Sequence, residues 1–573
     1  MKNFIRHVAF ILVVSNLISC DDLEPIDENR LEFDDIRNVP ERAEGILLNA
    51  YDDLVDQYSF TGVATDDAVH NDLGNGLKRM ALGELTAQFN PTSRWNSFEK
   101  VFFANRFLEI VNAGEINWSQ DPITNNLFND RLKGEALALR GLHHYYALQA
   151  HAGIDVSGDL SGIPYYSEFI ETDGDFNVPR LSFEASVAAI MADFDEALTL
   201  LPSIYSDNVS DIDERYADID PDIYKIVNGA QNDQRISGRI VKGLKARLAL
   251  FAASPSFLNG QDGYYSIAAN NSSEVLNTIG GVSGLAADGD EYYDSDSDID
   301  SGEMLWRGSI ENPNSFRERA NFPPSVNGDG DVNPSHNLVM AFPMRSGFPA
   351  TVENGFDPQN PYENRDPRLR KYIVVNGDSF GGSTINTGVG GGIDRLDSIS
   401  ESSTVTGYYL KKLLRPDVRL NDDNTTADQR HYDVYFRFTE LFLIFAEAAN
   451  EMGGPEMSIN GMTPREVIAA IRERAGISQP DDFLASVNSM GEMRDLIRNE
   501  RRLELSFEGH RFWDLRRWGL PLNETVTGYF FNGDDYVLLP AVEPRNYPSF
   551  ATYLPIPNNE VIKFPALEQN MGW

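Results

Sequence analysis

The chain has 573 residues, with 48 lysines and arginines against 88 aspartates and glutamates, and so a formal net charge of −40. This acidic balance argues against nucleic-acid binding, because phosphate backbones need lysine and arginine, and against adsorption to an anionic membrane surface. Hydrophobic residues make up 41% of the sequence and aromatic residues 11%, which is enough for a substantial buried core. The single cysteine excludes an intramolecular disulfide.

The N-terminal segment is predicted to be a targeting sequence. Residues 1–19 combine a basic start with an apolar run that is too short to span a membrane, as in a signal peptide. The run ends in Leu-Ile-Ser-Cys20, which resembles a lipobox in which Cys20 is lipidated and becomes the mature N-terminus. The alternative is a cleaved signal with an incidental cysteine. Residues 20–40 are acidic and contain two prolines, so we expect a tether, with the lipid as the membrane anchor.

Helical pairs are predicted over residues 41–279. Apolar residues recur at spacings of three and four, which is typical of amphipathic helices. Small alanines beside large leucines and tyrosines suit close helix packing, as in tetratricopeptide (TPR) units. The pairs repeat as a type but not at a strict period, and long connections interrupt them. We therefore predict a mostly α fold, a degenerate TPR-like helical-hairpin solenoid with long irregular loops and a few short strands. The predicted helices include residues 98–113, 126–152, 235–253 and 264–279, and a further helix with Ser182 as its N-cap.

Three histidines in the helix predicted at 126–152 raise the question of a metal site. His143 and His144 are adjacent and so face different ways, while His144 and His151 lie two turns apart. Packing or solvent exposure is therefore the preferred interpretation, and we predict no metal site.

A second region, residues 280–573, begins where glycine, aspartate and serine become frequent. The acidic runs at 294–300 and 327–333 offer oxygen ligands for Ca²⁺, but neither completes the EF-hand pattern. A solvated loop is the preferred interpretation of the first run, calcium is left open at both, and no cofactor is predicted. A short strand is expected at 303–307, and helices at 464–475 and 490–507.

Residues 498–519 combine a high density of charge with aromatic side chains. Six arginines stand among Glu500, Glu504, Glu508 and Asp514, and the three glutamates recur every four residues on one helix face. One interpretation is an active site with paired carboxylates. The preferred interpretation is an arginine–carboxylate network that holds two helices, because each acid has an arginine nearby in the sequence.

The same stretch resembles the C-terminal signature of the SusD/RagB family. Glu500-Arg-Arg-x-Glu, Phe507-Glu-Gly-x-Arg and Asp514-Leu-x-Arg-Trp match the family pattern in order. Further resemblances lie in separate segments along the chain. They are Glu135–Tyr146, Asn333–Met344, Asn364-Arg-Asp-Pro-Arg-Leu369, Thr406–Lys412, Arg437–Ala448 and the ending Gln569-Asn-Met-Gly-Trp573, where Met571 replaces the usual proline.

This resemblance implies a surface-exposed, lipid-anchored outer-membrane protein that captures an oligosaccharide or polysaccharide. It also implies a partner, a SusC-like TonB-dependent transporter that receives the glycan. The alternatives are a peptide-binding, RagB-like uptake receptor or a TPR scaffold, and a glycan hydrolase. The sequence has no nucleophile elbow, zinc-protease motif or phosphate-binding loop. Because two carboxylates suffice for a glycosidase, these absences do not exclude hydrolysis, but the expectation is a binding protein without catalytic residues.

The ligand is expected to bind to the long loops, because the helical motifs are committed to packing. In the family, as the resemblance implies, a shallow site is built from an N-terminal and a mid-chain loop. Here these are 59–97 and 280–330. Trp95, for which burial beside Phe98 and Phe102 is the alternative, is a candidate stacking platform. The full candidate set is Asp66, Asp67, His70, Trp95, Tyr292, Tyr293, Phe316 and Arg317.

Overall fold

The computed structural model describes residues 39–114, 116–294, 301–421 and 427–573. The predicted signal peptide, Cys20, nearly all of the tether and most of the acidic run at 294–300 lie outside these residues. Within the described ranges, none of the helices combines the length and the apolar character that crossing a membrane requires.

Helices make up most of the regular structure. The long helices are α5 (Ser97–Asn112), α6 (Pro122–His151), α7 (Phe183–Leu200), α9 (Gly238–Ala253), α10 (Tyr264–Asn277), α15 (Phe438–Gly453), α16 (Pro464–Arg474) and α18 (Met490–Glu504). The shorter ones are α3 (Pro40–Leu48), α4 (Gly76–Arg79), α8 (Pro221–Asn228), α11 (Glu291–Asp294), α12 (Phe316–Asn321), α13 (His336–Ala341), α14 (Arg368–Tyr372), α17 (Asp482–Ser486), α19 (Arg511–Trp518) and α20 (Asn558–Lys563).

The strands are short and pair two by two. In the described part of the chain, six antiparallel sheets of two strands are formed. They join β1 (Ala68–His70) to β5 (Val332–Pro334), β2 (Gly153–Ile154) to β3 (Leu160–Ser161), β4 (Met304–Ile310) to β10 (Tyr432–Arg437), β6 (Ile373–Val374) to β9 (Tyr409–Leu410), β7 (Asp378–Phe380) to β8 (Ser383–Ile385) and β11 (Val526–Phe531) to β12 (Tyr536–Glu543).

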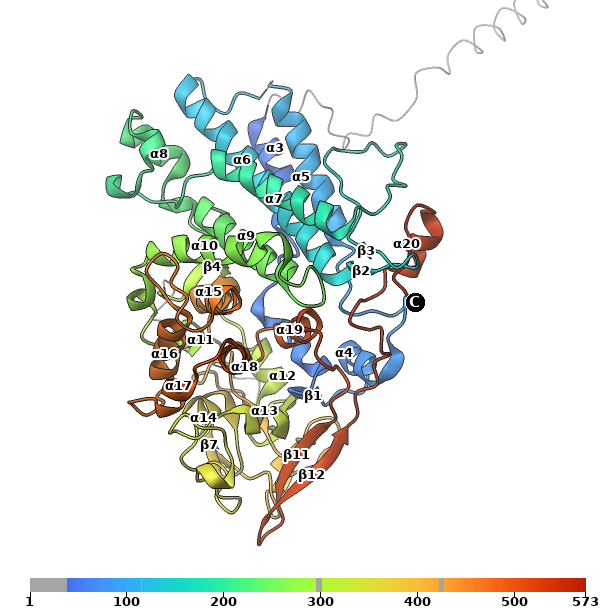
Figure 1. Cartoon of the computed structure of the whole chain (residues 1–573), viewed down its shortest axis with the longest axis vertical. Coiled ribbons are helices and arrows are strands. Elements are labelled where there is room, and N and C mark those ends of the chain that lie inside the picture. Colours follow the sequence, from blue (N-terminus) through green and yellow to red (C-terminus); the bar gives the residue numbers. More distant parts are fainter. Residues whose placement is uncertain (1–38, 115, 295–300, 422–426) are drawn as a thin grey trace, which may run out of the picture.

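The long helices stack in succession, as Figure 1 shows. Helix α5 packs on α6, α6 on α7, α7 on α9, α9 on α10, and α10 on α15, which in turn contacts α16 and α18. One large apolar core follows this stack from α3 to α18. It buries the apolar stripe of each helix, which an isolated helical pair would leave exposed to water. The prediction of a mostly α, TPR-like solenoid is confirmed.

A second apolar core supports the loop-rich part of the molecule. It gathers side chains from 63–68, from 292–434 and from the end of α18, and the short sheets lie around it. The β1–β5 pairing sets His70 opposite Val332 and so ties the N-terminal loop to the mid-chain region. The strand expected at 303–307 is confirmed as β4, and α18 ends at Glu504, three residues before the expected end.

Candidate functional site

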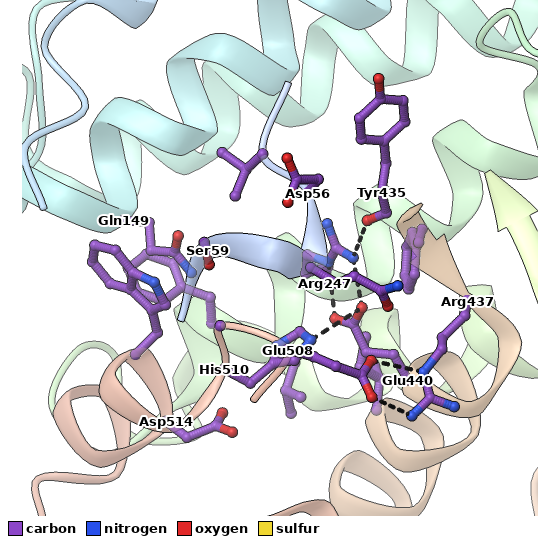
Figure 2. A pocket seen from close by; sticks show the side chains of 18 of the residues that line it. Asp56, Ser59, Gln149, Arg247, Tyr435, Arg437, Glu440, Glu508, His510 and Asp514 are labelled. Atoms are coloured by element: carbon purple, nitrogen blue, oxygen red, sulfur yellow. Dashed lines mark hydrogen bonds and ion pairs between the residues drawn. The ribbon is translucent and has the colours of Figure 1, made fainter. Parts of the chain in front are cut away.

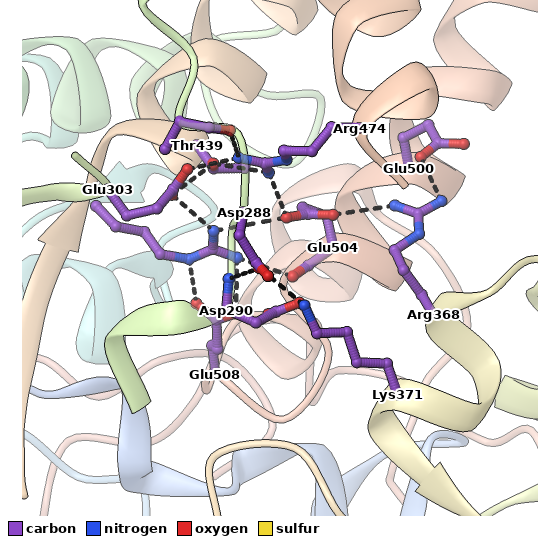
Figure 3. Close-up of polar contacts among 12 residues, drawn as sticks. Asp288, Asp290, Glu303, Arg368, Lys371, Thr439, Arg474, Glu500, Glu504 and Glu508 are labelled. Atoms are coloured by element: carbon purple, nitrogen blue, oxygen red, sulfur yellow. Dashed lines mark hydrogen bonds and ion pairs between the residues drawn. The ribbon is translucent and has the colours of Figure 1, made fainter. Parts of the chain in front are cut away.

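The charge-rich stretch of α18 and α19 forms a buried network, shown in Figure 3. Glu504 accepts hydrogen bonds from Arg368 Nη1 at 3.0 Å and from Arg474 Nη2 at 2.6 Å. Glu508 accepts from Arg437 Nε at 2.8 Å and from Lys412 Nζ at 2.7 Å. All these side chains are buried, and that of Arg474 is 7% exposed. The network joins α18 to α14, α16 and β10, segments far apart in the sequence.

A second cluster of ion pairs fixes α19. Asp514 accepts from Arg501 Nε and from Arg517 Nε, both at 2.8 Å, and Arg517 Nη2 reaches Glu447 of α15 at 2.6 Å. Burial alone would raise the pKa of the Asp514 carboxyl, but the two guanidinium groups outweigh it and lower the pKa to about 2. The same balance lowers the pKa of Glu447. Acids held ionised by arginine are poor proton donors, so the network fits a structural role.

A polar cavity lies between this network and the helical stack, as Figure 2 shows. Arg247 of α9 binds Glu440 through Nε at 2.9 Å and Nη2 at 2.6 Å, and Asp56 and Tyr435 also line the cavity. Burial lowers the pKa of His510 to about 4, more than neighbouring Glu440 raises it, so the imidazole is neutral at pH 7. The cavity holds about 90 Å³, against the 300–1,000 Å³ of typical ligand pockets. This space suits ordered water and not a sugar ring.

The two candidate aspartates of the N-terminal loop are not free. Asp66 Oδ2 lies 2.7 Å from Arg502 Nη2 and 3.1 Å from Arg511 Nη2, and Asp67 Oδ1 accepts from Arg502 Nε at 2.8 Å. Both acids are buried. Arg502 and Arg511 outweigh burial and lower the pKa of Asp66 to about 2. Arginines hold both candidate carboxylates, which therefore do not face solvent as groups that bind sugar hydroxyls would. Residues 498–519 hold six arginines and four acids, but this excess does not indicate which distant acids the arginines bind.

The two mid-chain tyrosines also pack inward. Tyr292 on α11 is buried and donates its hydroxyl to Gln57 Oε1 at 2.9 Å. Tyr293 is half-buried and meets the Tyr292 ring edge to face, with the centroids 5.1 Å apart. Apolar contacts with the second core occupy both rings, so neither of these two candidates presents an open ring to solvent.

Trp95 and His70 lie at separate places and are both half-buried. The Trp95 ring packs edge to face on Phe98 at 4.9 Å and on His151 at 5.3 Å, against the main core. These contacts resemble the alternative given for Trp95 in the sequence analysis, which is burial beside Phe98 and Phe102. His70, at the end of β1, has Nε2 3.8 Å from Asp331 Oδ2, and burial lowers its pKa.

Phe316 is a candidate that faces solvent. It is the first residue of α12, in the mid-chain loop, and it is 78% exposed. Next to it, Arg317 Nη2 donates to Asp433 Oδ1 at 2.8 Å, and its guanidinium carbon lies 4.5 Å from the centroid of the Tyr58 ring. Asn321 Nδ2 donates to the Tyr58 hydroxyl at 2.9 Å. We call Tyr58, Phe316, Arg317 and Asp433 the loop face. It joins the N-terminal segment to the mid-chain segment and to β10, and two of its residues, Tyr58 and Asp433, are not in the candidate set.

Tyr58 and Asp433 left a faint signal in the sequence. Tyr58 lies ten residues after the end of α3 and immediately before the loop assigned to 59–97. Asp433 is a charged residue in the strand Tyr432–Arg437, where Val434 and Phe436 are buried and Asp433 takes the opposite face.

The candidate metal ligands have other partners. In α6, His143, His144 and His151 are buried, and each bonds a carbonyl oxygen, those of Ala50, Arg140 and Pro555. Their packing role is confirmed. At 327–333, Asn327 donates its amide to the Leu420 carbonyl. Among the residues described, no group of three or more histidine, cysteine or acidic side chains is placed to hold a metal ion.

Comparison with known proteins covers most of the chain. Residues 293–573 match the model of the SusD family, and residues 37–216 match the family described as "Starch-binding associating with outer membrane". The SusD-like protein P25 of Formosa agariphila is 28% identical over 211 residues, a match that covers 35% of each chain. The chain thus spans about a third of the length of this curated relative.

Solved structures extend the similarity to the whole fold. A SusD-like protein from Bacteroides fragilis superposes with a TM-score of 0.72 at 21% identity, over 94% of this chain and 98% of that one. A laminarin-binding SusD-like protein gives a TM-score of 0.57 at 20% identity, over 93% and 99%. The two family models together span both the helical stack and the loop-rich region, and the chain belongs to the SusD/RagB family.

Proposed function

We propose that the protein binds a glycan at the cell surface and delivers it to a SusC-like TonB-dependent transporter. The observation that carries this proposal is the match of residues 37–216 to a family described as starch-binding and associated with the outer membrane. The laminarin-binding neighbour of similar fold supports a carbohydrate ligand.

The loop face supplies the chemistry that a sugar needs. The exposed Phe316 ring offers an apolar surface for the C–H face of a pyranose. Arg317 and its ion-pair partner Asp433 offer a hydrogen-bond donor and acceptor for hydroxyl groups, and the ion pair fixes their positions. These groups supply stacking and hydrogen bonding, so binding without chemistry is the function that they support best.

Hydrolysis would need two carboxyl groups with separated pKa values and no strong partner. Asp331 comes nearest, because burial and the charges of Asp329 and Asp72 raise its pKa to about 6. Its acidic neighbours Asp329 and Asp72 are both exposed, so the three acids do not form the enclosed pair of carboxyl groups that hydrolysis needs. We therefore propose a binding protein and not an enzyme.

The proposed membrane attachment rests on Cys20 and the acidic run after it. Cys20→Ala is expected to release soluble protein or to leave uncleaved precursor, measured by fractionation and by incorporation of labelled palmitate. A variant that still takes up palmitate and stays in the outer membrane would contradict the lipobox.

Binding is tested with the secreted form that begins after Cys20. Native gels cast with starch, laminarin or a sulfated glycan should show retardation in at least one neutral glucan, while a reducing-end assay shows no new ends. A peptide library serves as the control for a RagB-like receptor. Retardation in no glycan together with peptide binding would overturn the proposal.

A further inference from the structure

The C-terminal tail and the segment after α4 enclose a pocket that shares no residue with the loop face. Its volume is about 760 Å³, within the range of pockets that hold a small ligand. It lies near the C-terminus marked in Figure 1, between α4 and α20. We call it the tail pocket. Its lining includes Gln88, Arg545, Phe550, Asn558 and Trp573.

Backbone hydrogen bonds fix the two walls of the tail pocket against each other. The Asn546 N–H donates to the Ala81 carbonyl at 2.8 Å, and the Asn558 N–H donates to the Ala87 carbonyl at 2.9 Å. The Tyr547 hydroxyl donates to the Ala64 carbonyl at 2.7 Å. A pocket held in this way exists before a ligand arrives, which lowers the entropic cost of binding.

Two aromatic rings stand in this pocket at a right angle. The ring centroids of Phe550 and Trp573 are 4.9 Å apart with an interplanar angle of 89°, and both side chains are half-buried. The Trp573 indole N–H donates to the Tyr553 carbonyl at 2.8 Å, which fixes the orientation of the ring. Such a corner offers flat apolar surface to a ligand with a C–H face.

The polar lining includes four carboxamides, of which those of Asn523 and Asn546 bond to backbone groups of the protein. Within the described residues, the side-chain amides of Gln88 and Asn558 have no hydrogen-bond partner in the protein. A carboxamide both donates and accepts, and so does a sugar hydroxyl. These groups are therefore placed to exchange hydrogen bonds with a polyol.

The arginine of the tail pocket is already paired. Arg545 is buried and its guanidinium donates to the carbonyls of Thr65 and Ala68, at 2.8 and 2.7 Å, and to the Glu543 carboxylate. An anionic ligand would find no open counter-charge here and would meet a chain of net charge −40. None of the lining residues has an acidic side chain that could pair with a cationic ligand.

We propose that the tail pocket is a second glycan site, specific for a neutral oligosaccharide. This inference rests on the proposed carbohydrate-binding function and adds a location and a ligand class to it. It gives the protein two separate contacts for one long chain, or for two chains, which strengthens capture of a polymer by avidity.

The test uses maltohexaose and laminarihexaose as probes and the tryptophan fluorescence of the secreted form as the readout. Gln88→Ala combined with Asn558→Ala removes both amides without touching the core, and Phe316→Ala supplies a background with a weakened loop face. In that background we expect the remaining affinity to fall roughly tenfold when the amides are removed. When a hexaose is added to Phe316→Ala, the fluorescence change that remains should come from the tail pocket. Adding Trp573→Phe to this variant should abolish that change.

The outcomes separate the two proposals. Unchanged affinity on removal of the amides, in wild type and in Phe316→Ala alike, would overturn the tail pocket while the proposed function stands. Binding of an acidic hexamer, such as an alginate oligomer, in preference to both glucans would overturn the ligand class. Failure of the wild-type protein to bind any glycan would overturn both.

Discussion

The buried network and the loop face both set arginine beside aromatic rings, and they differ in what covers them. In the network, Arg437 is 2% exposed and the Trp518 ring is 4% exposed, so each charge is enclosed with its counter-charge. On the loop face, Arg317 pairs with a partly exposed Asp433, and Phe316 has no cover. A dense charge motif therefore serves the scaffold here, while the surface that we propose for recognition lies outside the motif.

The largest expected effect comes from breaking the network. Glu504→Ala leaves the buried cations Arg368, Arg437 and Arg474 without a shared carboxylate. Removing one partner of a buried ion pair costs about 3–5 kcal/mol in the free energy of unfolding, measured by urea titration. Asp495→Ala, an exposed acid on the same helix, is the control and should change stability by less than about 0.5 kcal/mol. Equal stability of the two variants would refute the structural role.

The second-largest effect is expected from acid, which should lower the free energy of unfolding through the same region. The pKa of Asp66 and that of Asp514 are both lowered to about 2 in the folded protein, because arginines outweigh burial. Their ionised forms therefore stabilise the fold fully above the ordinary pKa near 4. Each contribution, roughly 2 kcal/mol, is lost as the pH falls through 4 toward 2. Urea midpoints at pH 7, 4 and 2.5 measure this loss, and a flat profile would contradict it.

A smaller effect of opposite sign is expected near the N-terminal loop. Asp331 has a raised pKa of about 6, caused by burial and by Asp329 and Asp72. Its ionised form therefore destabilises the fold most above pH 6, and the penalty fades as the pH falls toward and below the ordinary pKa near 4, where the carboxyl becomes protonated in both states. Asp331→Asn should raise stability by about 1 kcal/mol at pH 8 and by much less at pH 4. A variant that is less stable at pH 8 would show that this acid has a favourable partner.

These differences explain how far the sequence was informative. Apolar spacing identified the helices, because the 3.6-residue period is a local property, and charge density located the network through Glu500, Glu504 and Glu508. The partners of Asp66 and Asp67 lie more than 400 residues away in the sequence, as the separation of 436 between Asp66 and Arg502 shows. No local pattern reports such a contact, so two buried acids were taken for binding groups. Tyr292 was included among the binding residues for the same reason, because its hydroxyl bonds to Gln57, which lies 235 residues away in the sequence.

The most direct test of the account compares stability and binding in one loop-face variant. Phe316→Ala removes an exposed ring, so its melting temperature should stay within about 1 °C of wild type, as should that of the control Val352→Ala, another exposed side chain. Retardation in the glucan that the wild type binds should weaken about fivefold in Phe316→Ala, the worth of one stacking contact of about 1 kcal/mol, and should be unchanged in the control. Wild-type retardation of a folded Phe316→Ala would contradict the assignment of recognition to the loop face.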